Sequence, residues 1–408
     1  MTQRHVHFFF GFFMSTFMLC FLACSRSLLL DAPAVGSMHL EIWQNETVNF
    51  NPDMHSDSMC MEDGAFRLDA GRILLKPLAI PVHPRRCNIE LEVSIKSSGD
   101  PWDKSGSLFA FAGDAGRDYL NRMLDGDDAD TTRFAGIVQE GVRQPPLELM
   151  RFITPFGVGH FSHTDRANNY RPEAVSRWAD SASWKADVSY LQPWLESADT
   201  IWIGAYIDTW TSEGYTLTAS LHVLESPLPC DWAAEHLIMP LFNTTKLAHD
   251  QRPFTQLPDS ALRIEFKLQH PGETTLHFLT TGHGGHAGGD EFTKQPHTLV
   301  LDGDTIDTWT PWRDDCGAFR RFNPTSGFWP STYVYRGDTL TERVASSDLS
   351  RSNWCPGDWV IPRSIALGRL GAGRHILHVD VPGAQPWSEN EFNFWNLAGC
   401  IEIQESYD

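Results

Sequence analysis

The chain has 408 residues, with 32 lysines and arginines against 52 aspartates and glutamates, and a formal charge of −20. This excess of negative charge repels phosphate backbones and argues against a nucleic-acid partner. The length suffices for two domains with hydrophobic cores. The 15 tryptophans supply flat apolar rings with a polar edge, which suit both protein cores and the faces of sugars.

The amino-terminal segment has the features of a secretory signal peptide. Arg4 precedes an apolar run over residues 8–22, and Ala23-Cys24 follows. The run is shorter than the about 20 residues that span a bilayer. We therefore predict that residues 1–24 are a signal peptide and that the protein is exported, either secreted, periplasmic or at the cell surface. A small residue before Cys24 is also typical of bacterial lipoprotein cleavage sites, so a lipid anchor at Cys24 is an alternative.

Short strand-like runs separated by glycine and proline clusters dominate the rest of the chain, without a sustained helical period or a repeat. Leu262 to Leu268 alternates apolar with polar residues, which is typical of a strand with one buried face. The pattern predicts an all-β protein of antiparallel sandwich or jelly-roll type. A proline-rich segment divides the expected domains, residues 38–226 and 230–405. Asp114 to Gly126 is expected to form a short surface helix.

The stretch from Gly99 to Ala112 places a carboxylate at a junction between a loop and a strand. Its glycine, proline and serine residues predict a loop, and Leu108 to Ala112 predicts a strand buried on both faces. Asp103 therefore has a fixed position with one side open to a ligand. Trp102 and Lys104 are available as an apolar wall and a countercharge. The simpler alternative is a solvated aspartate in a turn.

Four later stretches also carry polar residues among apolar neighbours. Asp208 and Glu291 in two of them, like Asp103, lie at strand ends or in loops, so a pair of jelly rolls can bring the three carboxylates together. The alternative is that Asp208 and Glu291 are solvated acids at strand ends. The four stretches are Arg151 to Gly159, Ile201 to Trp210, His283 to Phe292 and Arg351 to Gly357.

In their order, these stretches resemble the bacterial peptide-N-glycosidase F amidases, which release N-glycans from asparagine. The similarity covers most of the chain after the signal segment, and the shared order of its motifs is its most specific feature. The motifs are Trp102-Asp103, Arg151 to Gly159, Asp187-Val188, Ile201 to Trp210, Met239-Pro240, Gly285 to Glu291 with His297-Thr298, and Arg351 with Trp354-Cys355-Pro356-Gly357.

The resemblance implies two eight-stranded antiparallel jelly rolls packed side by side, with the catalytic cleft at their interface. It also implies a monomeric peptide-N4-(N-acetyl-beta-glucosaminyl)asparagine amidase that acts on N-glycoproteins or glycopeptides without a metal or organic cofactor. Asp103 corresponds to the essential acid, Glu291 to the second catalytic carboxylate and Asp208 to a third. The implied substrate-binding residues are Trp102, Lys104, Trp210, His286, Arg351 and Trp354.

The sequence departs from the family pattern around these residues. Gly289 and Thr293 replace cysteines that bracket the catalytic glutamate in the family, and Gly284 stands in place of a tryptophan. Lys104 replaces an arginine and cannot form its bidentate fork. Asp208 replaces a glutamate. In addition, the disulfide loop before the essential acid is replaced by a shorter segment, Ser97 to Asp100.

The six cysteines after the signal segment are an even number in an exported chain, which predicts disulfides. The chain has no CxxC motif, so a zinc site of that kind is not expected. Spacing alone leaves 15 connectivities open. The resemblance implies a bridge between Cys316 and Cys355, and we assign the remaining pairs as Cys60 with Cys87 and Cys230 with Cys400.

Two other functions remain open at this point. One is a non-catalytic protein that binds glycans or is displayed at the surface, with the same double jelly roll. The other is a copper-dependent monooxygenase, since that class also has paired jelly rolls and His283 and His286 form an HxxH motif. Copper sites need several histidine or methionine ligands in a defined geometry, and His286 already has a place in the amidase pattern.

Overall fold

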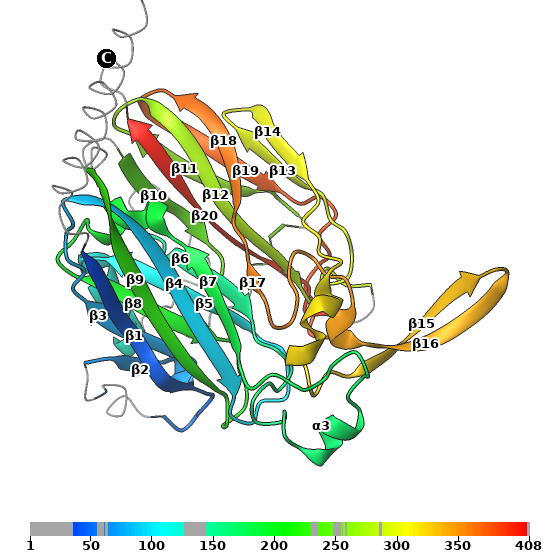
Figure 1. The fold of residues 1–408 in the computed structure, drawn as a ribbon. Helices are drawn as coiled ribbons and strands as arrows, with labels where there is room; N and C mark the ends of the chain where they lie inside the picture. The colour runs from blue at the N-terminus through cyan, green and yellow to red at the C-terminus, as the bar shows by residue number, and fades with distance from the viewer. Residues whose placement is uncertain are drawn as a thin grey trace, which may run out of the picture.

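The computed structural model describes residues 36–54, 61, 64–125, 144–229, 236–247, 254, 256–257, 259–284 and 288–405. These form two antiparallel β-sandwiches of jelly-roll type that pack side by side (Figure 1), as the sequence predicts. The last strand of the first sandwich ends at Pro229 and the first strand of the second begins at His236, so the predicted division at residues 226–230 overlaps the end of the last strand of the first sandwich. Within the described ranges, no helix is both long enough and apolar enough to cross a membrane.

The first domain consists of a four-stranded sheet packed on a six-stranded sheet. The four-stranded sheet has the order β1 (Ser37–Val48), β9 (Tyr215–Pro229), β4 (Arg85–Ser97), β7 (Ala182–Asp187). The other sheet has the order β17 (Trp359–Val360), β6 (Leu147–Ile153), β5 (Ser105–Ala112), β8 (Ile201–Ile207), β3 (Ile73–Leu78), β2 (Phe66–Leu68). Without β17, which comes from the second half of the chain, and the three-residue β2, this domain has the eight strands expected.

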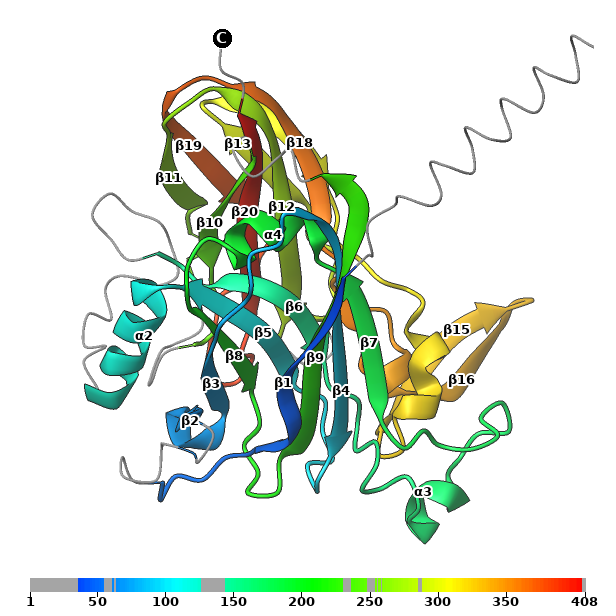
Figure 2. The same cartoon turned by 60° about the vertical axis from the view of Figure 1, so that its left-hand side comes forward.

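Strand β5 is buried on both faces, as its apolar run predicts. Leu108 and Ala110 face the core between the two sheets. Phe109 and Phe111 face outward, where they pack under helix α2 (Asp114–Asp125). The helix covers them with an apolar side made of Tyr119, Leu120 and Met123, and Figure 2 shows it on this outer face.

The second domain packs two four-stranded sheets around its own apolar core. One sheet has the order β10 (His236–Asn243), β20 (Phe394–Glu405), β12 (Gly272–His283), β18 (Arg363–Leu370). The other has the order β11 (Leu262–Leu268), β19 (Gly373–Asp380), β13 (His297–Leu301), β14 (Asp304–Trp309). Strand β11 has the bounds that the alternating pattern predicts, and it buries every second residue.

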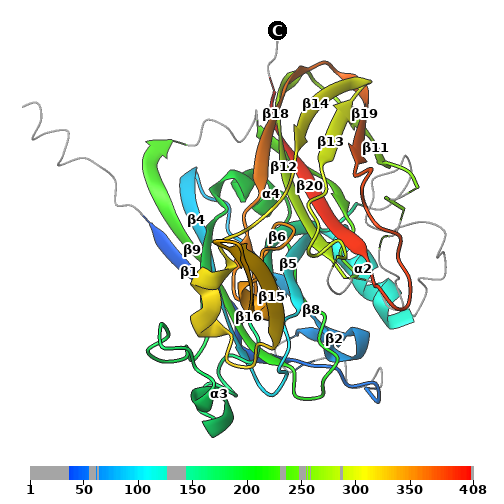
Figure 3. The ribbon, with the colours of Figure 1, turned by 90° about the vertical axis from the view of Figure 1, so that its right-hand side faces the viewer.

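A hairpin of strands β15 (Phe328–Tyr335) and β16 (Asp338–Ala345) projects from the body of the molecule (Figure 1), and in Figure 3 it points toward the viewer. Its turn consists of Arg336 and Gly337, both with positive φ, which is typical of the two-residue type I′ turn that matches the twist of a hairpin. Short helical turns complete the described elements: η2 (Asp69–Gly71), α3 (Asp165–Asn169), η3 (Ser189–Leu191), α4 (Gln192–Leu195), η4 (Cys316–Phe322) and η5 (Ser346–Asp348).

The two domains are joined by buried polar contacts as well as by β17. Arg151 on β6 is almost fully buried and pairs with Glu148 through two hydrogen bonds, of 3.0 and 2.6 Å. Its Nη1 donates to the carbonyl oxygen of Asn396 at 2.7 Å and to Thr281 Oγ1 at 3.2 Å, both in the second domain. Because an unpaired buried charge is costly, these contacts fix the position of one domain against the other.

Candidate active site

Asp103 lies in a loop that four hydrogen bonds hold in place. The N–H of Lys104 donates to Thr154 Oγ1 and the N–H of Thr154 donates to the Lys104 carbonyl, both at 2.8 Å. Tyr215 donates its hydroxyl to the carbonyl of Trp102 at 2.5 Å. From the second domain, Thr325 Oγ1 donates to the carbonyl of Pro101 at 2.5 Å. The backbone on both sides of Asp103 is therefore fixed, as a catalytic carboxylate requires.

Asp100 organises this loop, a role that the sequence analysis missed. Its side chain is fully buried and accepts the N–H of Trp102 at 3.0 Å and the hydroxyl of Thr209 at 2.7 Å. A bond from an aspartate to the N–H two residues later is the mark of an Asx turn. The Asp-Pro pair at the start of the loop is the sequence signal that could have indicated it.

Glu291 reaches the same site from the second domain. Its N–H donates to the carbonyl of Gly284 at 3.3 Å, and its carbonyl accepts the N–H of Ser352 at 3.0 Å. Its Oε1 accepts the Nε of Arg351 at 2.8 Å. The side chain is largely buried, with a small part still reaching the surface.

Arg351 is only 1% exposed and is held on several sides. Its Nη1 donates to the carbonyls of Ser346 and Leu349 at 2.7 and 2.9 Å. The guanidinium carbon lies 5.0 Å from the ring centre of Phe292 and 4.8 Å from that of Trp354. An arginine fixed in this way presents its Nε to Glu291 in one orientation.

The pKa values connect Asp103 and Glu291 electrostatically. Burial raises the pKa of Asp103, and the charges of Arg351 and Lys104 oppose that rise. Burial, helped by the charge of Asp103, raises the pKa of Glu291 to about 7, against the opposing charge of Arg351. Each domain thus contributes one carboxyl to a shared site, and Arg351 acts on both. Carboxyls with raised pKa values are suited to carry protons near neutral pH.

Asp290, next to Glu291, is a buried carboxylate surrounded by donors. It accepts Trp395 Nε1 at 3.1 Å, the N–H of Gln385 at 3.0 Å and Gln295 Nε2 at 3.3 Å. Burial nevertheless raises its pKa to about 6. Asp290 therefore ties the Glu291 loop to β20 and to the segment after β19. Asp290 is not among the residues predicted from the sequence.

Replacing Asp290 by alanine should destabilise the protein by about 1–3 kcal/mol, because the buried donors of Trp395, Gln385 and Gln295 would lose their acceptor. Chemical denaturation at pH 8 measures this effect. Asp304→Ala, an exposed change on β14, is the matched control and should leave the denaturation midpoint in place. Equal midpoints for the two variants would contradict the anchoring role of Asp290.

The loop that carries Glu291 is closed without the cysteines of the family pattern. Thr293 Oγ1 donates to the carbonyl of Gly288 at 3.0 Å, which joins the two sides of the loop. Gly284 explains the missing tryptophan: its φ is +82°, and a Cβ there would lie 1.7 Å from the carbonyl oxygen of Phe392. No side chain fits at this position in the present backbone.

Cys316 and Cys355 form the disulfide that the resemblance implies. Cys400 is a free buried cysteine, so its assigned pairing with Cys230 is wrong. Cys87 is also buried, but Cys60, the partner assigned to it, lies outside the described residues, so that pairing stays a prediction. The observed bridge spans 39 residues, which include the projecting hairpin and Arg351.

Removing this bridge with Cys316→Ser and Cys355→Ser together should lower the free energy of unfolding by roughly 4 kcal/mol on the loop-entropy model. The reason is that the unfolded chain would regain the freedom of a long loop. Denaturant unfolding of both proteins under non-reducing conditions gives the difference. A loss below about 1 kcal/mol would mean that the segment is held by its non-covalent contacts.

Asp208 and Trp210 lie beside the site but with partners of their own. The N–H of Asp208 donates to the carbonyl of Ser105, and its carboxylate lies 3.7 Å from Arg72 Nη1. The Arg72 guanidinium lies over the Trp210 ring at 4.4 Å. Trp210 is 53% exposed and Trp102 58% exposed. Both rings are therefore open to a ligand, whereas the role of Asp208 as a third catalytic carboxylate stays a prediction.

Arg351 and Trp354, two of the predicted substrate-binding residues, are almost fully buried. Trp354 is 3% exposed, donates its Nε1 to the carbonyl of Gly282 at 2.7 Å and stacks on His283. Because His283 and Arg351 both pack on the Trp354 ring, the ring has no face left for a sugar. Trp354 instead supports Arg351 in the site. His286 lies outside the described residues.

The proposed copper ligand His283 lies in an apolar stack. Its ring is between those of Trp354 and Phe394, and its Nε2 bonds to Thr281 Oγ1 at 2.8 Å. Burial and the charge of Arg151 lower its pKa to about 3, so the ring is neutral. These contacts give His283 a packing role.

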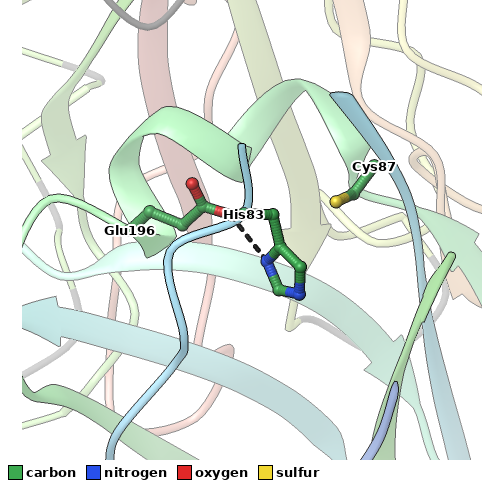
Figure 4. A group of neighbouring side chains, drawn as sticks. All are labelled: His83, Cys87 and Glu196. Atoms are coloured by element: carbon green, nitrogen blue, oxygen red, sulfur yellow. Dashed lines mark hydrogen bonds and ion pairs between the residues drawn. The ribbon is translucent and has the colours of Figure 1, made fainter. Parts of the chain in front are cut away.

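Another group with metal-binding side chains lies away from the carboxyl pair. His83, Cys87 and Glu196 bring their ligand atoms within 4.8 Å of one another (Figure 4). Hydrogen bonds account for this arrangement: His83 Nδ1 lies 3.0 Å from Glu196 Oε1, and Gln192 Nε2 donates to Glu196 Oε1 at 3.1 Å and to Cys87 Sγ at 3.6 Å. The group fastens α4 to the start of β4.

The fold and the site together define a two-domain jelly-roll protein with a carboxyl pair between its domains. The family models described as peptide-N-glycosidase F, N terminal, and peptide-N-glycosidase F, C terminal, match residues 39–223 and 255–402. The chain belongs to the peptide-N-glycosidase F family. No curated protein matches the sequence.

Solved structures agree with this assignment. PNGF-II in a C2 crystal form has a TM-score of 0.76 and 29% sequence identity over 91% of this chain, which spans 66% of the length of PNGF-II. A peptide-N(4)-(N-acetyl-beta-D-glucosaminyl) asparagine amidase has a TM-score of 0.60 and 14% identity, with 91% of this chain and 97% of that chain covered. PNGase F, a glycosylasparaginase from Flavobacterium meningosepticum, has a TM-score of 0.59, 14% identity and the same coverage. At 14% identity the similarity concerns the fold.

Proposed function

We propose that this protein is an exported amidase that hydrolyses the bond between N-glycans and asparagine in glycoproteins or glycopeptides. The observation that carries the proposal is the pair of raised-pKa carboxyls, Asp103 and Glu291, that the two domains contribute to one site beside Arg351. Membership of the peptide-N-glycosidase F family and the names of the similar structures support the same reaction and substrate class.

In the proposed mechanism, ionised Asp103 takes a proton from a water molecule while the water oxygen attacks the side-chain carbonyl carbon of the glycosylated asparagine. Glu291 gives its proton to the amide nitrogen as the carbon–nitrogen bond breaks. The products are an aspartate in the peptide and a glycan with a free amine on its first sugar. Arg351 holds Glu291 through Oε1, which leaves Oε2 to carry the transferred proton.

The substrate-binding part of the proposal concerns the open side of the site. Trp102 and Trp210 present exposed rings, and aromatic rings pack well on the apolar faces of sugars. Lys104 lies beside Asp103 and opposes the rise of its pKa. We propose that these three residues contact the glycan, and that His286 and Asp208 complete the binding surface.

The experiment that tests the proposal is incubation of the purified protein with an N-glycopeptide in water labelled with heavy oxygen. Mass spectrometry should find the released glycan and one labelled oxygen in the new aspartate. Glycan binding without release would favour the alternative of a non-catalytic glycan-binding protein.

A further inference from the structure

The projecting hairpin β15–β16 carries an exposed aromatic face that neither the packing of the two domains nor the proposed chemistry uses. Every described side chain from Thr332 to Arg343 is exposed. Alternate residues of a strand lie on the same face of the hairpin, and directly paired residues on the two strands also share a face. The register therefore places Trp329 and every second residue after it on one face, together with their partners on β16. The apolar members of this set are Trp329, Tyr333, Tyr335, Leu340 and Val344.

This aromatic face begins at the candidate active site. The Trp329 ring lies 6.1 Å from that of Phe292, the residue after Glu291. At the root of the hairpin, Ser346 donates its N–H to Gly327, and the Ser346 carbonyl accepts from Arg351. From Trp329 to Tyr335 the strand extends about 20 Å. The face therefore leads outward from the catalytic pair, as Figure 1 shows for the hairpin as a whole.

We propose that this face binds the polypeptide part of glycoprotein substrates in an extended conformation, an inference that rests on the proposed amidase function. Because the bond to be broken is in an asparagine side chain, the substrate polypeptide must pass within one side-chain length of the site. A hairpin that starts beside Glu291 is placed to receive it.

Two properties of the hairpin favour a polypeptide over a glycan. First, within the described residues β15 and β16 pair only with each other, so each has an outer edge whose backbone groups suit an added extended peptide. Second, a glycan needs polar side chains beside the aromatic rings to bond its hydroxyl groups. Glu342 on this face already accepts the Tyr333 hydroxyl at 2.8 Å, so these two polar groups are engaged with each other. In addition, the two arginines of the hairpin balance Asp338 and Glu342, so it does not repel acidic segments despite the negative charge of the protein.

The first test needs no catalysis. Calorimetric titration with an unfolded polypeptide that has no carbohydrate should detect binding to the unaltered protein. The double variant Tyr333→Ser, Tyr335→Ser should bind about tenfold more weakly, because exposed aromatic anchors carry much of the energy of such contacts. Val82→Ser removes a 73% exposed apolar residue elsewhere and is the matched control, with no expected effect. Equal affinity for the double variant and the unaltered protein would overturn the proposal.

The second test measures kcat/KM for glycan release from a denatured glycoprotein and from a single glycosylated asparagine. The ratio of the two values should fall about tenfold in the double variant.

If the hairpin instead joins two copies of the chain, the double variant will change the sedimenting mass and leave the polypeptide affinity unchanged, which overturns the proposal. If no glycan is released from any substrate but the double variant still loses polypeptide affinity, the amidase proposal fails, while binding of polypeptide by the hairpin stands.

Discussion

Replacing Asp103 by asparagine should lower the rate of glycan release from a glycopeptide by ~10² to 10⁴, the usual contribution of one acid–base group. Asparagine keeps the shape of the side chain but cannot take a proton from water. Glycan affinity should change little. Folding should not suffer either, because burial raises the pKa of Asp103 and so disfavours its charge in the folded protein. Release assays with mass spectrometric detection of the asparagine-to-aspartate conversion give the rate.

Two variants serve as comparisons for Asp103→Asn. Glu291→Gln removes the proposed proton donor and should reduce the rate to a similar extent. Asp208→Ala should mainly raise KM, because the carboxylate of Asp208 is directed at Arg72 rather than at the carboxyl pair. Full glycan release by the Asp103→Asn protein would show that the catalytic assignment is wrong.

Replacing Arg351 by methionine should affect both stability and the pH dependence of the reaction. Removing one partner of a buried ion pair costs about 3 kcal/mol or more. Without the guanidinium charge, the pKa of Glu291 should rise further above its value of about 7. Since Glu291 must hold its proton to act as the donor, the rate should fall above about pH 7 in the unaltered protein, and this limb should move to higher pH in the variant.

Profiles of kcat/KM against pH, together with denaturation midpoints, measure both effects. Arg117→Met, which removes an exposed arginine from helix α2, is the matched control and should leave both unchanged. Arg351→Lys keeps a charge but not the fixed geometry of the guanidinium, so it should restore part of the profile. A folded Arg351→Met protein with an unshifted alkaline limb would refute the role of Arg351.

The strands were predictable because burial leaves a periodic mark on the sequence. Alternation of apolar and polar residues predicted β11. An uninterrupted apolar run predicted β5 as a strand buried on both faces. The projecting hairpin was missed, although Thr332 to Tyr335 is a run of β-branched and aromatic residues and Arg336-Gly337 is a turn signal. Its strands never enter the core, so the apolar contrast that identifies the other strands is weak there.

The site was predictable only in part, for a different reason. Asp103 and Glu291 came from the order of motifs shared with a family. Asp100 and Asp290 did not: the Asp-Pro pair indicates a turn at Asp100, but the local sequence does not show whether either aspartate is solvated or buried. The hydrogen-bond donors that these buried carboxylates need come from residues far along the chain, Thr209 for Asp100 and Trp395 for Asp290. Trp354, expected to contact a sugar, is likewise buried and packs against Arg351.

Strand β17 has a consequence for how the protein folds and unfolds. Trp359 and Val360 come from the second half of the chain, yet they pair with Phe152 and Arg151 and so complete the edge of a sheet in the first domain. A first domain made alone would present β6 as an open edge, which invites aggregation. The second domain alone would lose the strand with which β17 pairs, and Asn396 and Thr281 would lose the guanidinium of Arg151. The two sandwiches are therefore expected to melt together in one cooperative transition, and the site between them exists only when both are folded.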